Sequence, residues 1–174
     1  MINDFITWIG ERPHERFRTV WTAVSSAGLV AVSLWPERER IEAEVVRLTG
    51  RAPLYDVAQT TAVLDQLDEY WHGRRQTFNV PINWAVMTPF QQTALRAVAA
   101  IPYGQYLTYA DVAGRIGQPQ AVRAVGRANA TNPMPVIIPC HRVLGSDGRL
   151  HGYGGPGGLE TKAWLLRLEG AWLL

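Results

Sequence analysis

The first half of the chain opens with a hydrophobic pattern typical of β-strands. Residues 18–24 and 29–35 are rich in β-branched and aromatic side chains. Residues 25–28, Ser-Ser-Ala-Gly, lie between them and favour a turn. This arrangement predicts a β-hairpin.

Helical periodicity follows the predicted hairpin. Apolar residues recur at helical spacing from Ile41 to Leu48 and again from Val63 to Trp71, with Gly50 and Gly73 placed to end the two helices. The later run 78–82 contains a proline, which cannot donate to a ladder, so it predicts an edge strand at most. We find no catalytic constellation in this half and expect a small α/β unit that supports the rest of the chain.

The second half begins with two helix-start signals. Thr88 before Pro89 predicts an N-cap followed by proline at the first helical position. Thr108, with Asp111 three residues later, fits a capping box. A final helix is expected over residues 158–169, because its leucines can pack and a glycine follows as its cap.

Between these helices lies a pattern typical of DNA-binding domains. Residues 108–117 and 120–130 predict two short helices joined by a tight turn, with Arg123 and Arg127 on one face of the second. Many helical hairpins bind nothing, so this pattern alone does not establish DNA binding. Residues 142–151 predict a hairpin around a Ser-Asp-Gly turn, as in a winged helix. The expected fold class is therefore α/β (α+β), with a small sheet domain followed by a winged helix-turn-helix domain.

Charge supports a division of the 174 residues into domains 1–84 and 85–174. The first carries nine arginines against eleven acidic residues, and the second seven arginines and one lysine against four acidic residues. The positive half is the one with the helix-turn-helix pattern, so we expect a polyanionic partner. The single lysine, Lys162, among sixteen arginines is interpreted as a feature of composition. No apolar run approaches the ~18 residues of a membrane span, and no secretory leader is recognisable.

The chain has one cysteine, Cys140, which excludes an internal disulfide and a multi-cysteine zinc site and fits a reducing compartment. It follows the apolar, strand-like run 136–139 and precedes His141 and Arg142. A lone cysteine is most often a small buried hydrophobe. A neighbouring cation, or a neutral histidine acting as base, would instead favour the thiolate.

Adjacent residues on a straight strand point to opposite faces, so contact between Cys140 and His141 requires a bend or a bridging water. Pro139 is placed to break the strand there. The histidine also needs a partner that fixes its tautomer. The second half offers four carboxylates, and composition does not choose among them: Asp111, Asp147, Glu160 and Glu169.

The segment Pro139-Cys140-His141-Arg142-Val143, preceded by Asn132-Pro133-x-Pro135, resembles the active-site signature of the O6-alkylguanine-DNA alkyltransferases, the methylated-DNA–protein-cysteine methyltransferases. The resemblance covers residues 85–170, and the first half matches only in layout. Further segments fall at the spacing of this family: Thr88-Pro89-Phe90-Gln91, Ile101-Pro102-Tyr103-Gly104, Tyr109-x3-Ala113, Arg123-Ala124-Val125-Gly126 and Trp164-Leu165-Leu166-x2-Glu169-Gly170.

The resemblance implies roles for five residues in the reaction. Cys140 is implied as the alkyl acceptor, His141 as the base that deprotonates it through a water, and Glu169 as the group behind the histidine. Asn132 is implied to brace the turn around the cysteine. Tyr109 is implied to donate a proton to the leaving guanine.

The resemblance also implies contacts with substrate and DNA. Arg123 matches an arginine finger that enters the base stack, and Tyr153 matches a wall of the pocket. The implied substrate-binding residues are Arg123, Tyr153, Gly154, Pro135 and Asn129. The expected DNA-binding residues are Arg123, Gln91, Thr93, Thr108 and Arg127, because helix N-termini and arginines favour phosphate.

The implied function is direct-reversal DNA repair. An O6-alkylguanine, and also an O4-alkylthymine, would be flipped out of duplex DNA and would lose its alkyl group irreversibly to the cysteine, once per chain. No metal or soluble cofactor is implied. A monomer in the cytoplasm, associated with the nucleoid if prokaryotic, is expected. The Gly/Pro loop 154–158 is about two residues longer than the family pattern, which leaves the range of alkyl groups open.

Three other interpretations remain at this point. A non-enzymatic lesion sensor related to the alkyltransferases would lack the acceptor cysteine. A winged-helix transcription factor would prefer one DNA sequence and would ignore replacement of Cys140. A thiol hydrolase using Cys140 and His141 would turn over repeatedly.

Overall fold

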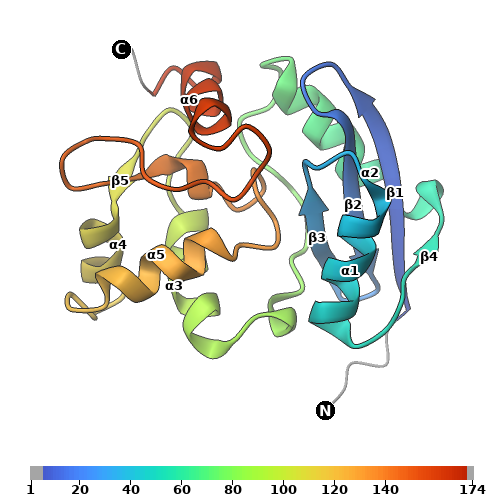
Figure 1. Ribbon diagram of the computed structural model, residues 1–174, viewed down its shortest axis with the longest axis horizontal. Helices are drawn as coiled ribbons and strands as arrows, with labels where there is room; N and C mark the ends of the chain where they lie inside the picture. The colour runs from blue at the N-terminus through green and yellow to red at the C-terminus, as the bar shows by residue number, and fades with distance from the viewer. Residues whose placement is uncertain (1–5, 172–174) are drawn as a thin grey trace. The chain divides into compact units, whose positions relative to one another are not determined.

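The computed structural model describes residues 6–171. The chain divides into two compact units between Met87 and Thr88, whereas the sequence analysis placed the division after Trp84. The first unit contains a β-sheet with two helices, and the second is built mainly from helices and loops (Figure 1). The mixed α/β fold class is therefore confirmed.

The sheet of the first unit has four strands in the order β3-β2-β1-β4. β1, β2 and β3 pair antiparallel, and β4 pairs in parallel with β1. The predicted hairpin is confirmed as β2 and β3. The strand bounds are β1 (Thr7–His14), β2 (Arg18–Ser25), β3 (Gly28–Ser33) and β4 (Leu54–Tyr55).

The central strand β1 was not predicted, because Gly10 and the charged residues around it hide its pattern. Gly10 has a steric reason to be there: a Cβ would overlap the Thr60 hydroxyl and lie 2.9 Å from the Cα of Val57. The helix that carries these two residues therefore packs directly on this strand.

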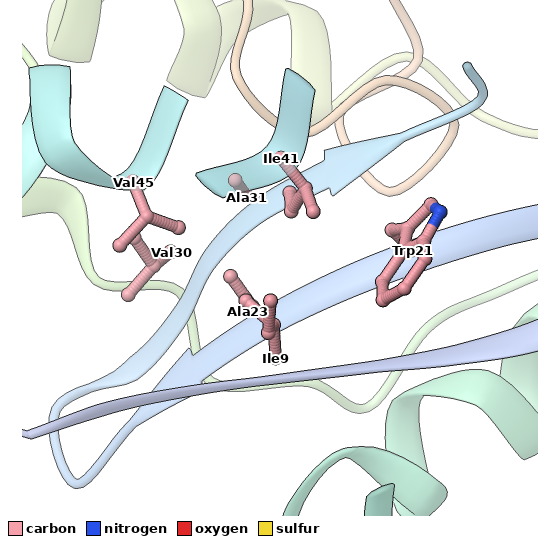
Figure 2. Packing of buried hydrophobic residues seen from close by; sticks show 7 residues of the cluster. All are labelled: Ile9, Trp21, Ala23, Val30, Ala31, Ile41 and Val45. Atoms are coloured by element: carbon pink, nitrogen blue, oxygen red, sulfur yellow. The ribbon is translucent and has the colours of Figure 1, made fainter. Parts of the chain in front are cut away.

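Each face of the sheet carries one helix, α1 (Arg38–Thr49) or α2 (Val57–Trp71). Successive strand residues face opposite sides, and Ile9 packs toward α1 while the next residue abuts α2. Figure 2 shows the cluster under α1, where Ile41 and Val45 meet the sheet. Burial of each such side chain contributes roughly 1.5–3 kcal/mol. Both predicted helices are thus confirmed.

The predicted edge strand over residues 78–82 is wrong. Only one parallel bridge, Leu29 to Ile82, is present there. The Leu29 N–H donates to the Pro81 carbonyl at 2.7 Å, and the Asn83 N–H donates to the Leu29 carbonyl at 2.9 Å. The segment then turns into the 3-10 helix η1 (Trp84–Val86).

Over residues 88–171, the second unit holds four α-helices, a 3-10 helix and a two-stranded parallel sheet. Its elements are α3 (Pro89–Ala99), β5 (Leu107–Thr108), α4 (Tyr109–Arg115), α5 (Val122–Ala130), η2 (Cys140–Arg142), β6 (Val143–Leu144) and α6 (Leu159–Leu168). The predicted N-caps of α3 and α4 are confirmed. In both, the threonine hydroxyl accepts from the backbone N–H three residues on, whose side chain accepts the threonine N–H.

α4 and α5 form the helix-turn-helix, and α3 packs against both. α5 begins at Val122 rather than at Gln120, because the Ala121 N–H donates to the Gln118 carbonyl and closes a turn first. Among residues 6–171, no helix is both long enough and apolar enough to cross a membrane.

Two predicted β elements of this unit are wrong. Residues 136–139 are buried but form a tight turn, in which Val136 has a φ of 75° and a single bridge joins Pro135 to Ile138. In the predicted hairpin over 142–151 the Ser-Asp-Gly turn forms, with the Gly145 N–H donating to the Arg149 carbonyl at 3.0 Å, but the strand ladder does not, and β6 pairs with β5 instead. The physical reason lies in Lys162, whose ammonium binds the carbonyls of Val143 and His151 that hairpin strands would use.

Candidate active site

Cys140 lies at the start of η2, directly after Pro139, so the bend expected at this proline is present. Its side chain reaches a cavity of about 290 Å³. The cavity is lined from the start of α4, from α5, from η2 and from the loop before α6. The lining residues are Tyr109, Gly126, Asn129, Ala130, Cys140, Gly152, Tyr153 and Gly154.

Behind the cysteine lies a buried ionic cluster of His141, Arg142 and Glu169. Nε2 of His141 is 2.8 Å from Oε1 of Glu169, and both side chains are fully buried. Arg142 donates to the two Glu169 oxygens at 2.8 and 2.9 Å and to the Ile101 carbonyl at 2.6 Å. Of the four carboxylates that the sequence offered, the structure brings Glu169 to the histidine.

The cluster fixes the protonation of its members. Burial alone would raise the pKa of Glu169, but the hydrogen bonds from His141 and Arg142 outweigh it and lower that pKa to about 2. Burial lowers the pKa of His141 despite the adjacent carboxylate, so the ring is neutral at pH 7. With Nε2–H donating to Glu169, Nδ1 is left as the basic nitrogen. It has no hydrogen-bond partner among residues 6–171.

The thiol of Cys140 is held in its neutral form by burial, which raises its pKa. Several groups act in the opposite direction: the side chain of Asn132, the charge of Lys162, and the backbone N–H groups of Cys140 and His141. Arg142 points to Glu169 rather than to the thiol. A base is therefore needed to produce the thiolate, and the surroundings are arranged to receive it.

Asn132 braces the turn that leads to the cysteine. Its amide Nδ2 donates to the Ile138 carbonyl at 2.9 Å, and its Oδ1 accepts the Met134 N–H at 3.0 Å. These bonds hold the two ends of the turn together. The structure thus places Asn132 where a bracing role requires it.

Three other polar side chains line the cavity. The Tyr109 hydroxyl donates to the His151 carbonyl at 3.3 Å, and burial raises its pKa although nearby Asn129 lowers it. Asn129 is 7% exposed, and neither atom of its amide has a hydrogen-bond partner of normal geometry within the described chain. The Tyr153 hydroxyl is also buried without such a partner, and burial raises its pKa. The cavity therefore offers polar atoms to a ligand.

The remaining candidate residues divide into those at the cavity and those away from it. Gly154 lines the cavity, where a Cβ would lie 3.2 Å from the Ala130 carbonyl. Pro135 is half-buried and is not part of the cavity wall. Arg123 and Arg127 are exposed on α5.

The three residues expected to contact phosphate with polar uncharged side chains make hydrogen bonds within the protein instead. Gln91 caps α3 and donates to the Thr131 hydroxyl at 2.9 Å. The Thr93 hydroxyl donates to the Pro89 carbonyl, and the Thr108 hydroxyl donates to Asp111. In the structure, these three side chains therefore have partners within the protein, mainly at the starts of α3 and α4.

Sequence reasoning missed Lys162, which is fully buried on α6 and donates to backbone carbonyls near the cavity. The available signal was its uniqueness in a chain whose other strong bases are all arginine. Among residues 6–171, no group of three or more histidine, cysteine or acidic residues could hold a metal ion.

The chain is similar to proteins named methylated-DNA–protein-cysteine methyltransferase. Residues 89–171 match the family described as 6-O-methylguanine DNA methyltransferase, DNA binding domain. The constitutive methylated-DNA–protein-cysteine methyltransferase of Bacillus subtilis is 49% identical over 104 residues, 60% of this chain. The chain spans 62% of the length of that relative. The Salmonella typhimurium protein of the same name is 39% identical over 140 residues, which cover 79% of this chain and 80% of that protein.

Solved structures extend the similarity to nearly the whole chain. The Mycobacterium tuberculosis O6-methylguanine methyltransferase is 31% identical with a TM-score of 0.78, over 97% of this chain and 96% of that one. A structure of Mycobacterium tuberculosis OGT in complex with DNA is 32% identical with a TM-score of 0.77, over 95% and 92%. The chain therefore belongs to the methylated-DNA–protein-cysteine methyltransferase family.

Proposed function

We propose that this protein repairs O6-alkylguanine in duplex DNA by moving the alkyl group irreversibly to Cys140. The observation that carries the proposal is the thiol in the wall of a cavity next to α5, backed by the His141–Glu169 pair. Relatives named methylated-DNA–protein-cysteine methyltransferase, and a structural neighbour solved with DNA, support it. The proposal includes O4-alkylthymine as a second substrate and action as a monomer in the cytoplasm.

The transfer is an in-line displacement in which each proton has a carrier. Nδ1 of His141 takes the proton of Cys140 through a bridging water, and Glu169 stabilises the imidazolium. The thiolate attacks the alkyl carbon, so the S–C bond forms as the C–O6 bond breaks. The electron pair stays on guanine, which takes a proton from Tyr109, and the proton on His141 returns to the tyrosinate by way of solvent. The product thioether is inert to water, so one chain reacts once.

The lesion must leave the base stack to reach a buried thiol. The cavity has polar atoms for a base, in particular the amide of Asn129 and the hydroxyls of Tyr109 and Tyr153. Arg123 on the exposed face of α5 would fill the gap left in the duplex, with the helix in the minor groove. Arg127, one turn further, would contact phosphate.

Stoichiometry tests this proposal against the thiol-hydrolase interpretation. A fixed amount of protein is mixed with increasing excess of a duplex containing O6-methylguanine, and repaired lesions are counted. We expect a plateau at about one lesion per chain, and none with Cys140→Ser. Continued turnover beyond one lesion per chain, or repair by Cys140→Ser, would overturn the mechanism.

A further inference from the structure

Asn129 keeps a polar side chain inside the protein without a hydrogen bond of normal geometry. It lies on α5, is 7% exposed, and neither Oδ1 nor Nδ2 of its amide has such a partner within residues 6–171. A buried amide of this kind is unfavourable, because it has lost its bonds to water and gained none in return. An apolar side chain of similar size would be more favourable there. The amide is therefore better explained by a bond that forms during the reaction.

The position of Asn129 is in the wall of the reaction cavity. α5 contributes Gly126, Asn129 and Ala130 to this wall. The second and third follow the first by three and four positions, so the three residues share one face of the helix. Tyr109, the first residue of α4, lines the same cavity, and α4 packs against α5. The amide and the tyrosine hydroxyl are thus held on neighbouring helices around one cavity.

The Tyr109 hydroxyl lacks a donor for the charge that it would acquire in the reaction. It donates to the His151 carbonyl at 3.3 Å, which is longer than the ~2.8 Å typical of an O–H···O bond. A carbonyl oxygen accepts the hydroxyl proton but has no proton to offer. Once the tyrosine has given its proton to a base, its oxygen is negative and is stabilised by an N–H or O–H donor. The contact with His151 therefore suits the neutral tyrosine and not the tyrosinate.

Two side chains in the described wall of the cavity have donors without a partner of normal geometry, the amide of Asn129 and the hydroxyl of Tyr153. Of these, Asn129 is the one whose hydrogen bond lowers the pKa of Tyr109, against the increase caused by burial. Catalytic hydrogen bonds are often poorly aligned without substrate and tighten in the complex. Rotation of the Tyr109 hydroxyl toward a base leaves a lone pair of its oxygen for the amide.

We propose that Asn129 is a positioning residue for the proton donor, whose Nδ2–H group binds the Tyr109 oxygen and stabilises the tyrosinate formed as guanine takes the proton. This inference rests on the proposed function, in which Tyr109 protonates the leaving base. The O–H bond of the tyrosine breaks as an N–H bond forms on guanine, and the negative charge left on oxygen is held by the amide. Because this hydrogen bond is stronger to the tyrosinate than to the tyrosine, it accelerates the transfer.

Other titratable groups also face Tyr109 and have to stay constant in a test. The thiolate of Cys140 on η2 raises its pKa, and the ammonium of Lys162 on α6 lies 5.7 Å from the centre of its ring. On α4 itself, Asp111 accepts from the Thr108 hydroxyl. A substitution confined to Asn129 retains all three groups, so a change in the titration of Tyr109 is due to the amide.

The hydrogen bond is tested by the titration of Tyr109. The six tyrosines are replaced biosynthetically by 3,5-difluorotyrosine, whose more acidic hydroxyl titrates while the protein is folded and is followed by ¹⁹F NMR. The Tyr109 signal is the one absent from Tyr109→Phe. We expect Asn129→Leu, and the smaller Asn129→Ala if leucine prevents folding, to raise its midpoint by about one pH unit. Tyr153→Phe, the control, should leave this midpoint in place. An unchanged midpoint in the folded Asn129 variant, or an equal shift in Tyr153→Phe, would overturn the proposal.

The effect on the reaction is tested with two reagents for the same thiol. O6-Benzylguanine releases guanine, which takes a proton, whereas iodoacetamide releases iodide, which takes none. We expect Asn129→Leu to slow the reaction of Cys140 with O6-benzylguanine about tenfold or more, with no change in its reaction with iodoacetamide. Equal slowing with both reagents would show that the substitution disturbs the thiol or the fold, and would refute a role through Tyr109.

A double substitution separates action through the tyrosine from direct action on the base. In Tyr109→Phe, the further change Asn129→Leu should not slow the reaction with O6-benzylguanine again. Full slowing in this background would mean that the amide binds guanine itself, and the proposal would be wrong. If the native protein takes up no benzyl group at all, the proposed function fails, whereas the titration still decides whether Asn129 binds the Tyr109 oxygen.

Discussion

At the scale of single residues, the site depends on a carboxylate that is buried and fully engaged. Glu169 shares its two oxygens between His141 and Arg142, with no exposed side-chain surface. Such a cluster contributes little net stability compared with an apolar one, but removal of one partner leaves a buried charge without compensation. The cluster is therefore better explained by its effect on the reaction than by stability, since Glu169 sets the tautomer of His141.

Replacement of Glu169 by glutamine should affect both stability and reactivity. We expect a loss of about 3–5 kcal/mol in the free energy of unfolding at pH 7, because Arg142 is then buried without a counterion. Alkylation of Cys140 should also slow, since the imidazolium is no longer stabilised. Urea denaturation and iodoacetamide kinetics measure the two effects. Glu160→Gln, at an exposed position in the first turn of α6, is the matched control. Equal losses in both variants would contradict the assignment.

The same carboxylate predicts an acid limit. The pKa of Glu169 is lowered from 4.5 to about 2, so its stabilising effect is complete above about pH 4.5 and is lost as the pH falls toward 2. The stability difference between native protein and Glu169→Gln should shrink over that range. A difference that stays constant down to pH 2 would exclude this linkage.

At the scale of elements, segments with local signals were predictable and segments that depend on distant partners were not. Thr88 and Thr108 carry their cap partners three residues away, so the starts of α3 and α4 could be read from sequence. The expected hairpin after η2 failed because Lys162, nineteen residues beyond Val143, binds the carbonyl that a ladder would use. The strand β1 was not predicted, because Gly10 is required by its close packing against Thr60, on a helix far along the chain.

A substitution on the exposed face of α5 should slow the reaction with duplex DNA but not the reaction with a free alkylated base. We expect Arg123→Ala to slow repair of O6-methylguanine in duplex about tenfold or more, because unstacking of the lesion loses its stabilising partner. Reaction with free O6-benzylguanine, which needs no flipping, should be unchanged. Arg115→Ala, exposed at the end of α4, serves as control. If Arg123→Ala slows both reactions equally, the finger role is wrong.

At the scale of the whole molecule, the two halves of the chain differ in net charge and in the side chains that they carry. The first unit folds around its own sheet core, and no candidate site residue lies in it. The second unit carries the positive charge, the helix-turn-helix and the cavity. Phosphate contacts from this half should make binding salt-dependent and nearly independent of sequence.

One part of the site could be predicted from the sequence, and another part could not. Cys140, His141 and Glu169 were expected from the resemblance of their motifs, and the structure brings them together. Two buried contacts, Arg142 with Glu169 and Lys162 with the Val143 carbonyl, join residues that are 27 and 19 positions apart in the chain. Local sequence patterns do not encode such contacts, so they could be identified only from the folded structure.

The most direct test of the account is the mass of the peptide that contains Cys140 after the protein meets a duplex bearing O6-methylguanine. The account predicts one added methyl group on that peptide, on the cysteine sulfur, with unmodified guanine left in the DNA. A peptide of unchanged mass from a folded protein that has bound the duplex, or a methyl group found on another residue, would contradict it.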